Sequence, residues 1–221
     1  MKNRKNTVIA IDGPAGSGKS TTARLVARKL GFLYLDTGAM YRALTYGVLK
    51  EKKDPSSPAA VESVLKGSAL RAETSPGRCR IFLGKQEVSN KLRSRSIETN
   101  VSMVSRHQKV RRLMVELQRR ESQKGNLVIE GRDTATIVFP RADLKIFLQA
   151  SLTERAKRRA KKSLRLQLEE KELLRRDRLD STRPVAPLKR ARDSYLIDTT
   201  GLTIPQQVRM VLQLFEKKID V

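Results

Sequence analysis

Cysteine and histidine are almost absent from this chain of 221 residues. Cys79 is the only cysteine, so an internal disulfide and a cysteine zinc site are both excluded. His107 is the only histidine, which excludes a histidine-rich metal site and argues against Ser-His-Asp hydrolysis. This composition is typical of a reducing compartment, and we expect a cytoplasmic protein.

Long hydrophobic runs are also missing, so the sequence predicts no transmembrane helix and no membrane partner. The first apolar run, Val8–Ile11, is too short for a secretory signal, and we expect none. The length suits one domain with a hydrophobic core and small inserts. No long exposed apolar stripe stands out, so we expect a monomer.

Acidic residues are scarce relative to basic ones: 23 Asp and Glu stand against 47 Lys and Arg, a formal charge of +24. Nucleotide substrates are anions and account for part of this excess. The remainder fits either a solvated basic surface or contacts with nucleic acid. Tryptophan is absent and aromatic residues make up 4% of the chain, which argues against binding of single strands by stacking. We therefore expect any nucleic-acid binding to be non-specific.

One segment carries a strong functional signal: Gly13, four residues, then Gly18-Lys19-Ser20. A strand pattern precedes it and a helical pattern over 19–30 follows, as a phosphate-binding loop requires. Glycines let the backbone N–H groups converge on one point, and the helix N-terminus adds partial positive charge. Lys19 is expected at the β- and γ-phosphates of a nucleoside triphosphate, and the Ser20 hydroxyl on Mg²⁺. The predicted ATP-binding residues are Gly13, Pro14, Ala15, Gly16, Ser17, Gly18, Lys19, Ser20 and Thr21.

Strand and helix patterns alternate along most of the chain, which predicts an α/β fold with a parallel sheet covered by helices on both faces. The five expected strands are 8–11, 32–35, 127–130, 144–148 and 195–198. The stretch from 67 to 105 breaks this alternation. Within it, 80–83 and 87–88 flank Gly84-Lys85-Gln86 and predict a β-hairpin in a small insert.

Three pairs of residues have the spacing of a capping box at a helix start. They are Ser105 with Gln108, Ser151 with Glu154, and Thr203 with Gln206. The helix after Ser105 places apolar residues on one face, and so does the helix after Thr203. We expect both helices to cover the sheet.

Charged residues follow two of the expected strands: Asp36 to Arg42 after the second, and Glu130 to Thr134 after the third. In open α/β sheets, ligands bind beyond the carboxyl ends of the strands. Arg42, Arg132 and Asp133 are therefore expected beside the phosphate loop, where a second anionic substrate would face the γ-phosphate.

The helix after Ser151 is rich in arginine and lysine. Arg155, Arg158, Arg159 and Lys162 fall on one face by their spacing. Such a face is often simply solvated. An arginine that closes on the transition state of phosphoryl transfer contributes about 10³–10⁵ in rate, which favours a functional interpretation.

Together these segments resemble bacterial cytidylate kinases, a family of nucleoside monophosphate kinases. The resemblance lies in residues 11–22, 36–42, 130–140 and 176–188, and it extends in order over nearly the whole chain. It implies a P-loop kinase fold with a five-stranded parallel sheet flanked by helices. It also implies a single domain over 1–221, with a monophosphate-binding insert at 67–105 and a short lid at 151–185.

The resemblance further implies roles for individual residues. The catalytic set is Lys19, Arg132, Asp133, Arg155 and Arg159. The substrate-binding set is Asp36, Thr37, Arg42, Ser102, Arg111, Arg132, Asp133, Arg176, Asp180 and Arg183. Within it, Arg42, Arg132 and Arg176 are expected at the acceptor phosphate, Ser102, Arg111 and Asp133 at the cytosine edge, and Asp180 with Arg183 near the ribose. Ala135 departs from the family pattern, which has glycine there.

The expected reaction is phosphorylation of CMP and dCMP by Mg-ATP to CDP and dCDP. A phosphate acceptor is already ionised, so no strong general base is required, and arginine suits its bidentate recognition. Three alternatives stay open: a nucleic-acid-binding ATP switch, a GTPase switch, and a kinase of a small metabolite. The charge of +24 favours the first. Against the second, Asn90-Lys91-Leu92 is followed by Arg93 where a guanine-reading segment has aspartate. Against the third stand the long insert and residues 180–188.

Overall fold

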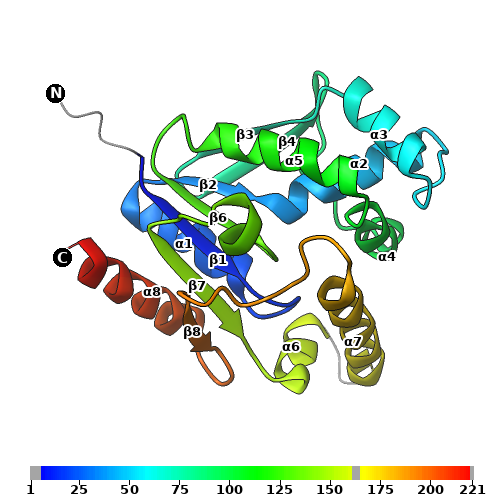
Figure 1. Ribbon diagram of the computed structural model, residues 1–221. Coiled ribbons are helices and arrows are strands. Elements are labelled where there is room, and N and C mark those ends of the chain that lie inside the picture. The colour runs from blue at the N-terminus through cyan, green and yellow to red at the C-terminus, as the bar shows by residue number, and fades with distance from the viewer. Residues whose placement is uncertain (1–5, 161–164, 220–221) are drawn as a thin grey trace, which may run out of the picture.

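The computed structural model describes residues 6–160 and 165–219. Its main sheet contains five parallel strands in the order β2-β6-β1-β7-β8 (Figure 1). The strands are β1 (Val8–Asp12), β2 (Leu33–Asp36), β6 (Leu127–Gly131), β7 (Leu144–Gln149) and β8 (Tyr195–Asp198). The expected fold class and all five expected strands are confirmed.

The register of the sheet brings the functional segments to one edge. Asp12, the last residue of β1, pairs with Gly131 of β6, and Asp36 at the end of β2 pairs with Glu130. The chain order reverses at β1, whose neighbours β6 and β7 lie on either side, so this is a topological switch point. In open α/β sheets such a point is where ligands bind.

Helices cover both faces of the sheet because the strands are buried on both sides. Val8 and Ala10 of β1 belong to one core cluster, and Ile9 and Ile11 belong to the other. Burying one such side chain contributes about 1.5–3 kcal/mol. One face is covered by α1 (Lys19–Leu30) and α8 (Ile204–Ile219), and the opposite core contains residues of α2 (Thr37–Lys50), α3 (Pro58–Gly67), α4 (Arg95–Val104) and α5 (Gln108–Glu121).

The insert forms a second, antiparallel sheet in the order β3-β4-β5. Its strands are β3 (Arg71–Ser75), β4 (Arg78–Leu83) and β5 (Gln86–Glu87), followed by a 3₁₀ turn at Ser89–Lys91. The predicted hairpin is confirmed as β4 and β5. The sequence did not indicate β3, because only Ala72 of that strand is buried and its polar residues show no strand alternation.

Two further helices, α6 (Leu152–Arg159) and α7 (Leu166–Thr182), follow β7 in the chain and pack against each other (Figure 1). A π-helical turn at Thr134–Val138 follows β6. No helix in the described residues combines the length and apolar content needed to cross a membrane.

Two of the three predicted capping boxes are consistent with the structure, and one is wrong. The Ser151 hydroxyl accepts from the Glu154 N–H at 3.2 Å, and the Gln206 side chain accepts from the Thr203 N–H at 2.8 Å. Ser105 instead ends α4, and its hydroxyl donates to the Ser102 carbonyl at 3.2 Å. The helix α5 begins after His107 with no side-chain cap.

Candidate active site

The phosphate loop, residues 13–20, connects β1 to α1. Gly16 and Gly18 have left-handed backbones with φ values of 79° and 90°, a conformation that side chains rarely adopt. A Cβ on Gly16 would lie 2.9 Å from the Arg155 Cβ, and one on Gly18 would lie 2.7 Å from the Gln207 Oε1. Glycine is therefore needed at both positions for conformation and for space. The loop leads into the N-terminus of α1, where free N–H groups favour a phosphate.

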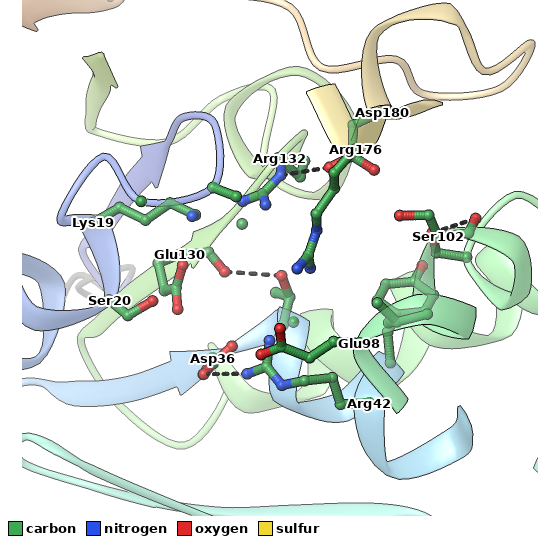
Figure 2. Close-up of a pocket in the computed structure, with 18 of the residues that line it drawn as sticks. Lys19, Ser20, Asp36, Arg42, Glu98, Ser102, Glu130, Arg132, Arg176 and Asp180 are labelled. Carbon is green, nitrogen blue, oxygen red and sulfur yellow. Dashed lines mark hydrogen bonds and ion pairs between the residues drawn. The ribbon is translucent and has the colours of Figure 1, made fainter. Parts of the chain in front are cut away.

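Lys19 lies at one end of the cleft, beside this loop (Figure 2). The residue is 7% exposed, and its Nζ donates to the Pro14 carbonyl oxygen at 3.2 Å. Burial, with a further contribution from Arg132, lowers the pKa of Lys19 well below its ordinary value. An adjacent phosphate would restore the charged form, because an opposite charge favours ionisation.

Ser20 and Glu130 place oxygen atoms next to Lys19 (Figure 2). Burial raises the pKa of Glu130, and the nearby Asp36 carboxylate raises it further. Hydroxyl and carboxylate oxygens are ligands that Mg²⁺ prefers, and Mg²⁺ usually takes its remaining ligands from phosphate and water. This donor set fits that ion, although the described residues contain no group of three or more acidic, histidine or cysteine side chains arranged for a metal.

Two arginines at this edge are positioned by carboxylates. Arg42 Nη2 lies 2.9 Å from Asp36 Oδ2, and the other oxygen of Asp36 caps α2 by accepting from the Ala39 N–H at 2.7 Å. Arg132 Nε donates to Asp180 of α7 at 2.8 Å, and its Nη1 donates to the Gly13 carbonyl at 3.0 Å. Of the predicted acceptor-phosphate residues, Arg132 therefore contacts the phosphate loop, and Arg42 lines the same cleft from α2.

Arg176 differs from its neighbours, because no ion pair compensates its charge among the described residues. The side chain extends from α7 into the middle of the cleft, between Arg132 and Arg42 (Figure 2). Its Nε is buried without a hydrogen-bond partner. Burial and the nearby Arg132 lower the pKa of Arg176 to about 10. This cationic position would be stabilised by a bound anion.

The far end of the cleft is organised around Asp133. One carboxylate oxygen accepts from Arg111 of α5, which also donates to the Ser105 carbonyl at 3.0 Å. The other accepts from Arg183 at 3.3 Å. Arg111 and Asp133, predicted to read the cytosine edge, are thus paired with each other, and Ser102 lies nearby on the cleft wall.

The three arginines of α6 have different surroundings. Arg155 is 7% exposed and donates to Asp177 at 2.6 Å and to the Ala15 carbonyl at 3.2 Å. Arg158 donates to the Gly16 carbonyl at 3.4 Å. Arg159 bridges Glu98 of α4 at 2.9 Å and Glu169 of α7 at 2.8 Å. Lys162, expected on the same face, lies outside the described residues.

A single cleft of 670 Å³ brings most of the predicted residues together. The predicted residues that line it are Ala15, Gly16, Gly18, Lys19, Ser20, Thr21, Asp36, Thr37, Arg42, Ser102, Arg111, Arg132, Asp133, Arg159, Arg176, Asp180 and Arg183. Arg155 does not line it and lies behind the phosphate loop. Residues outside the predicted catalytic and binding sets also line it: Tyr41, Arg93, Glu98, Glu130, Arg158 and Glu169. Two of these had a signal in the sequence: Arg158 lies on the predicted basic face after Ser151, and Glu130 opens the charged segment after its strand.

The family model described as cytidylate kinase matches residues 9–217. The chain belongs to the cytidylate kinase family. It is 43% identical to a cytidylate kinase of Geobacillus sp. (strain WCH70), covering 98% of this chain and 99% of the relative. It is 44% identical to a cytidylate kinase of Bacillus licheniformis, covering 97% and 98% of the two chains.

Among solved structures, an uncharacterised protein of Eubacterium ventriosum aligns with a TM-score of 0.51 at 16% identity, over 96% of this chain and 99% of that one. This likeness concerns the fold alone. Members of the cytidylate kinase family are phosphotransferases, and the phosphate loop and cleft arginines of this member suit that chemistry.

Proposed function

We propose that this member of the cytidylate kinase family transfers the γ-phosphoryl group of Mg-ATP to CMP and dCMP. The observation that carries the proposal is the arrangement of the cleft. Lys19 and the phosphate loop lie at one end and Ser102 lies at the other, and Arg176, which makes no ion pair among the described residues, stands between them. Two anionic substrates entering from the two ends would meet at this cation.

The donor phosphates would bind the N–H groups of the phosphate loop, with Lys19 on the β- and γ-phosphates. Ser20 and Glu130 would hold Mg²⁺, which neutralises charge on the donor phosphates. Burial raises the pKa of Glu130, and a bound cation would favour its ionised form, which is the form that ligates a metal.

The acceptor phosphate would bind Arg42, Arg132 and Arg176. Both ion-paired arginines have donor groups beyond those that bind carboxylates, because a guanidinium carries five N–H groups. Charge on the transferring group is stabilised by these fixed donors, which need not reorganise during the reaction. No protein base is required, since a phosphate oxygen is the nucleophile.

The acceptor nucleoside would occupy the far end of the cleft. Ser102, Arg111 and Asp133 would read the cytosine edge, and Asp180 with Arg183 would contact the ribose. The pairing of Arg111 with Asp133 supports this assignment, because it fixes both groups before the base arrives and so lowers the entropy cost of recognition.

The two mobile parts would be the insert at 67–105 and the lid at 151–185. The bridge from Arg159 to Glu98 and Glu169 supports this division, since it joins helix α4 of the insert to α6 and α7 of the lid. Closure over the cleft would exclude water and prevent ATP hydrolysis. A monomer in the cytoplasm stays a prediction from the sequence.

A coupled assay of ADP release tests the proposal, with Mg-ATP and one acceptor at a time: CMP, dCMP, UMP, AMP, GMP, shikimate, RNA or none. We expect rapid turnover with CMP and dCMP and only background ADP release without acceptor. A matched preparation of Lys19→Ala should show no transfer while keeping the wild-type circular dichroism spectrum. Equal ATP hydrolysis in every well, or turnover only with RNA, would contradict the proposal.

A further inference from the structure

Three consecutive carbonyl oxygens of the phosphate loop accept hydrogen bonds from side chains outside the loop. The Ala15 carbonyl accepts from Arg155 Nη1 at 3.2 Å, and the Gly16 carbonyl accepts from Arg158 Nη1 at 3.4 Å. The Ser17 carbonyl lies 3.0 Å from the hydroxyl of Thr199, whose single proton it shares with the Gln149 carbonyl at 2.9 Å. The donors come from two separate segments, helix α6 and the turn after β8.

The direction of these carbonyls determines the direction of the loop N–H groups. A peptide group is planar and trans, so its N–H points opposite to its C=O. Holding the carbonyls of Ala15, Gly16 and Ser17 therefore fixes the N–H groups of Gly16, Ser17 and Gly18. The Ser17 N–H also makes a long hydrogen bond to the Pro14 carbonyl, at 3.4 Å. A carbonyl that accepts a hydrogen bond also polarises its peptide group, which strengthens the N–H as a donor.

The donors are themselves held in place, which makes them suitable supports. Arg158 is bound to Glu154 at 3.0 Å, and its Nη2 donates to the Thr199 carbonyl at 2.6 Å. Its Nη1 donates to the Thr199 hydroxyl at 3.0 Å. Thr199 is fully buried, and its N–H donates to the Gln149 carbonyl at 2.8 Å. Arg158 and Thr199 thus form one connected unit under the loop.

We propose that Arg158 and Thr199, together with Arg155, are positioning residues that orient the phosphate-loop N–H groups toward the donor phosphates. The inference rests on the proposed function, which places those phosphates in the loop. It assigns Arg155 to the loop backbone and not to the transferring phosphoryl group. It also predicts that the three side chains act on triphosphate binding and not on acceptor binding.

Binding of inorganic tripolyphosphate, ATP and CMP to the whole protein, measured by titration calorimetry, tests this. Thr199→Val is nearly isosteric and removes only the hydroxyl. Arg158→Lys keeps the charge but cannot span the carbonyls of Gly16 and Thr199 together. Lys157→Met, on the exposed face of α6, is the control for a substitution in the same helix that leaves the phosphate-loop contacts in place.

We expect Thr199→Val and Arg158→Lys to raise the Kd for tripolyphosphate and for ATP about tenfold, as the loss of one supporting hydrogen bond would. The Kd for CMP should stay within twofold of the wild-type value, and Lys157→Met should match the wild type throughout. Tripolyphosphate has no base or ribose, so its weaker binding cannot come from a lost nucleoside contact.

Other outcomes would overturn the inference. An unchanged Kd for tripolyphosphate with a raised Kd for ATP would make Arg158 a nucleoside contact. Equal weakening of CMP and tripolyphosphate would indicate a general structural loss. If Thr199→Val does not fold, Arg158→Lys decides the question. If the wild-type protein binds neither tripolyphosphate nor ATP, the proposed function itself is refuted.

Discussion

We expect Arg176 to lower the stability of the free protein and to increase its catalytic turnover. A substitution at this position should therefore change the two quantities in opposite directions. Its guanidinium has no carboxylate partner among the described residues and lies near Arg132 in the cleft. Arg176→Met removes the charge but keeps most of the hydrocarbon stem. We expect the variant to be more stable than the wild type and much less active.

The size of the gain follows from the pKa. Burial and Arg132 lower the pKa of Arg176 from its ordinary value to about 10, which corresponds to a cost of about 3 kcal/mol for holding the charge. Solvent in the open cleft screens part of this, so we expect a gain of about 1–2 kcal/mol in the free energy of unfolding. The gain should be constant from pH 6 to 8, because the guanidinium is charged in both the folded and the unfolded state there.

Thermal unfolding followed by circular dichroism measures this gain as a rise in Tm of about 2–8 °C for a chain of this size. In the coupled assay with CMP, turnover should fall at least about 10²-fold, the usual loss when one donor to a developing charge is removed. Added CMP should stabilise the variant less than the wild type.

Arg175→Met is the matched control, since Arg175 is exposed on the same helix and does not line the cleft. It should change neither Tm nor turnover appreciably. If Arg176→Met lowers the Tm of the free protein, the guanidinium stabilises the fold and the reasoning is refuted. Higher stability with normal turnover would refute the catalytic part alone.

Three further predictions concern the rest of the cleft. Binding of ATP without divalent cations at pH 8 should take up close to one proton, because Lys19 has a lowered pKa in the free protein and phosphate restores its charge. Calorimetry in buffers of different ionisation enthalpy measures this proton uptake, and equal uptake by Lys19→Met would refute the prediction. Arg132→Ala should lose at least about 10²-fold in turnover; a loss below twofold in steady-state assays would make Arg132 a structural partner of Asp180. Glu98→Gln should raise the KM for CMP about two- to fivefold at low salt, as expected for the loss of one partly exposed ion pair with Arg159. The difference from the wild type should vanish at high salt. A KM that is unchanged at both salt concentrations would show that the ion pair does not assist closure.

The local sequence was sufficient for the sheet and for the donor end of the cleft. Buried strands and amphipathic helices repeat with different periods, so the five strands and α1 could be read from residue order alone. The phosphate loop is equally local, because its glycines, lysine and serine lie within one turn between a strand and a helix. The carboxyl ends of parallel strands meet at one edge, which predicted the neighbourhood of Arg42 and Arg132.

Contacts between distant segments could not be predicted in this way. Helical spacing put Arg155, Arg158 and Arg159 on one face, yet each has different partners in the structure. Arg155 lies behind the phosphate loop, whereas Arg159 reaches Glu98, 61 residues away in the chain. Which carboxylate or carbonyl a long side chain meets depends on the packing of helices, and no local pattern encodes it.

The sequence by itself thus determined the fold class, the phosphate loop and the set of charged residues available to the cleft. Tertiary structure alone decided which of those charges are compensated. Asp133 is shared by Arg111 and Arg183, Asp180 binds Arg132, and Arg176 is left without a carboxylate among the described residues. The physical reason is that ion pairing depends on distances of a few ångströms between side chains from different elements, and these distances exist only once the elements have packed.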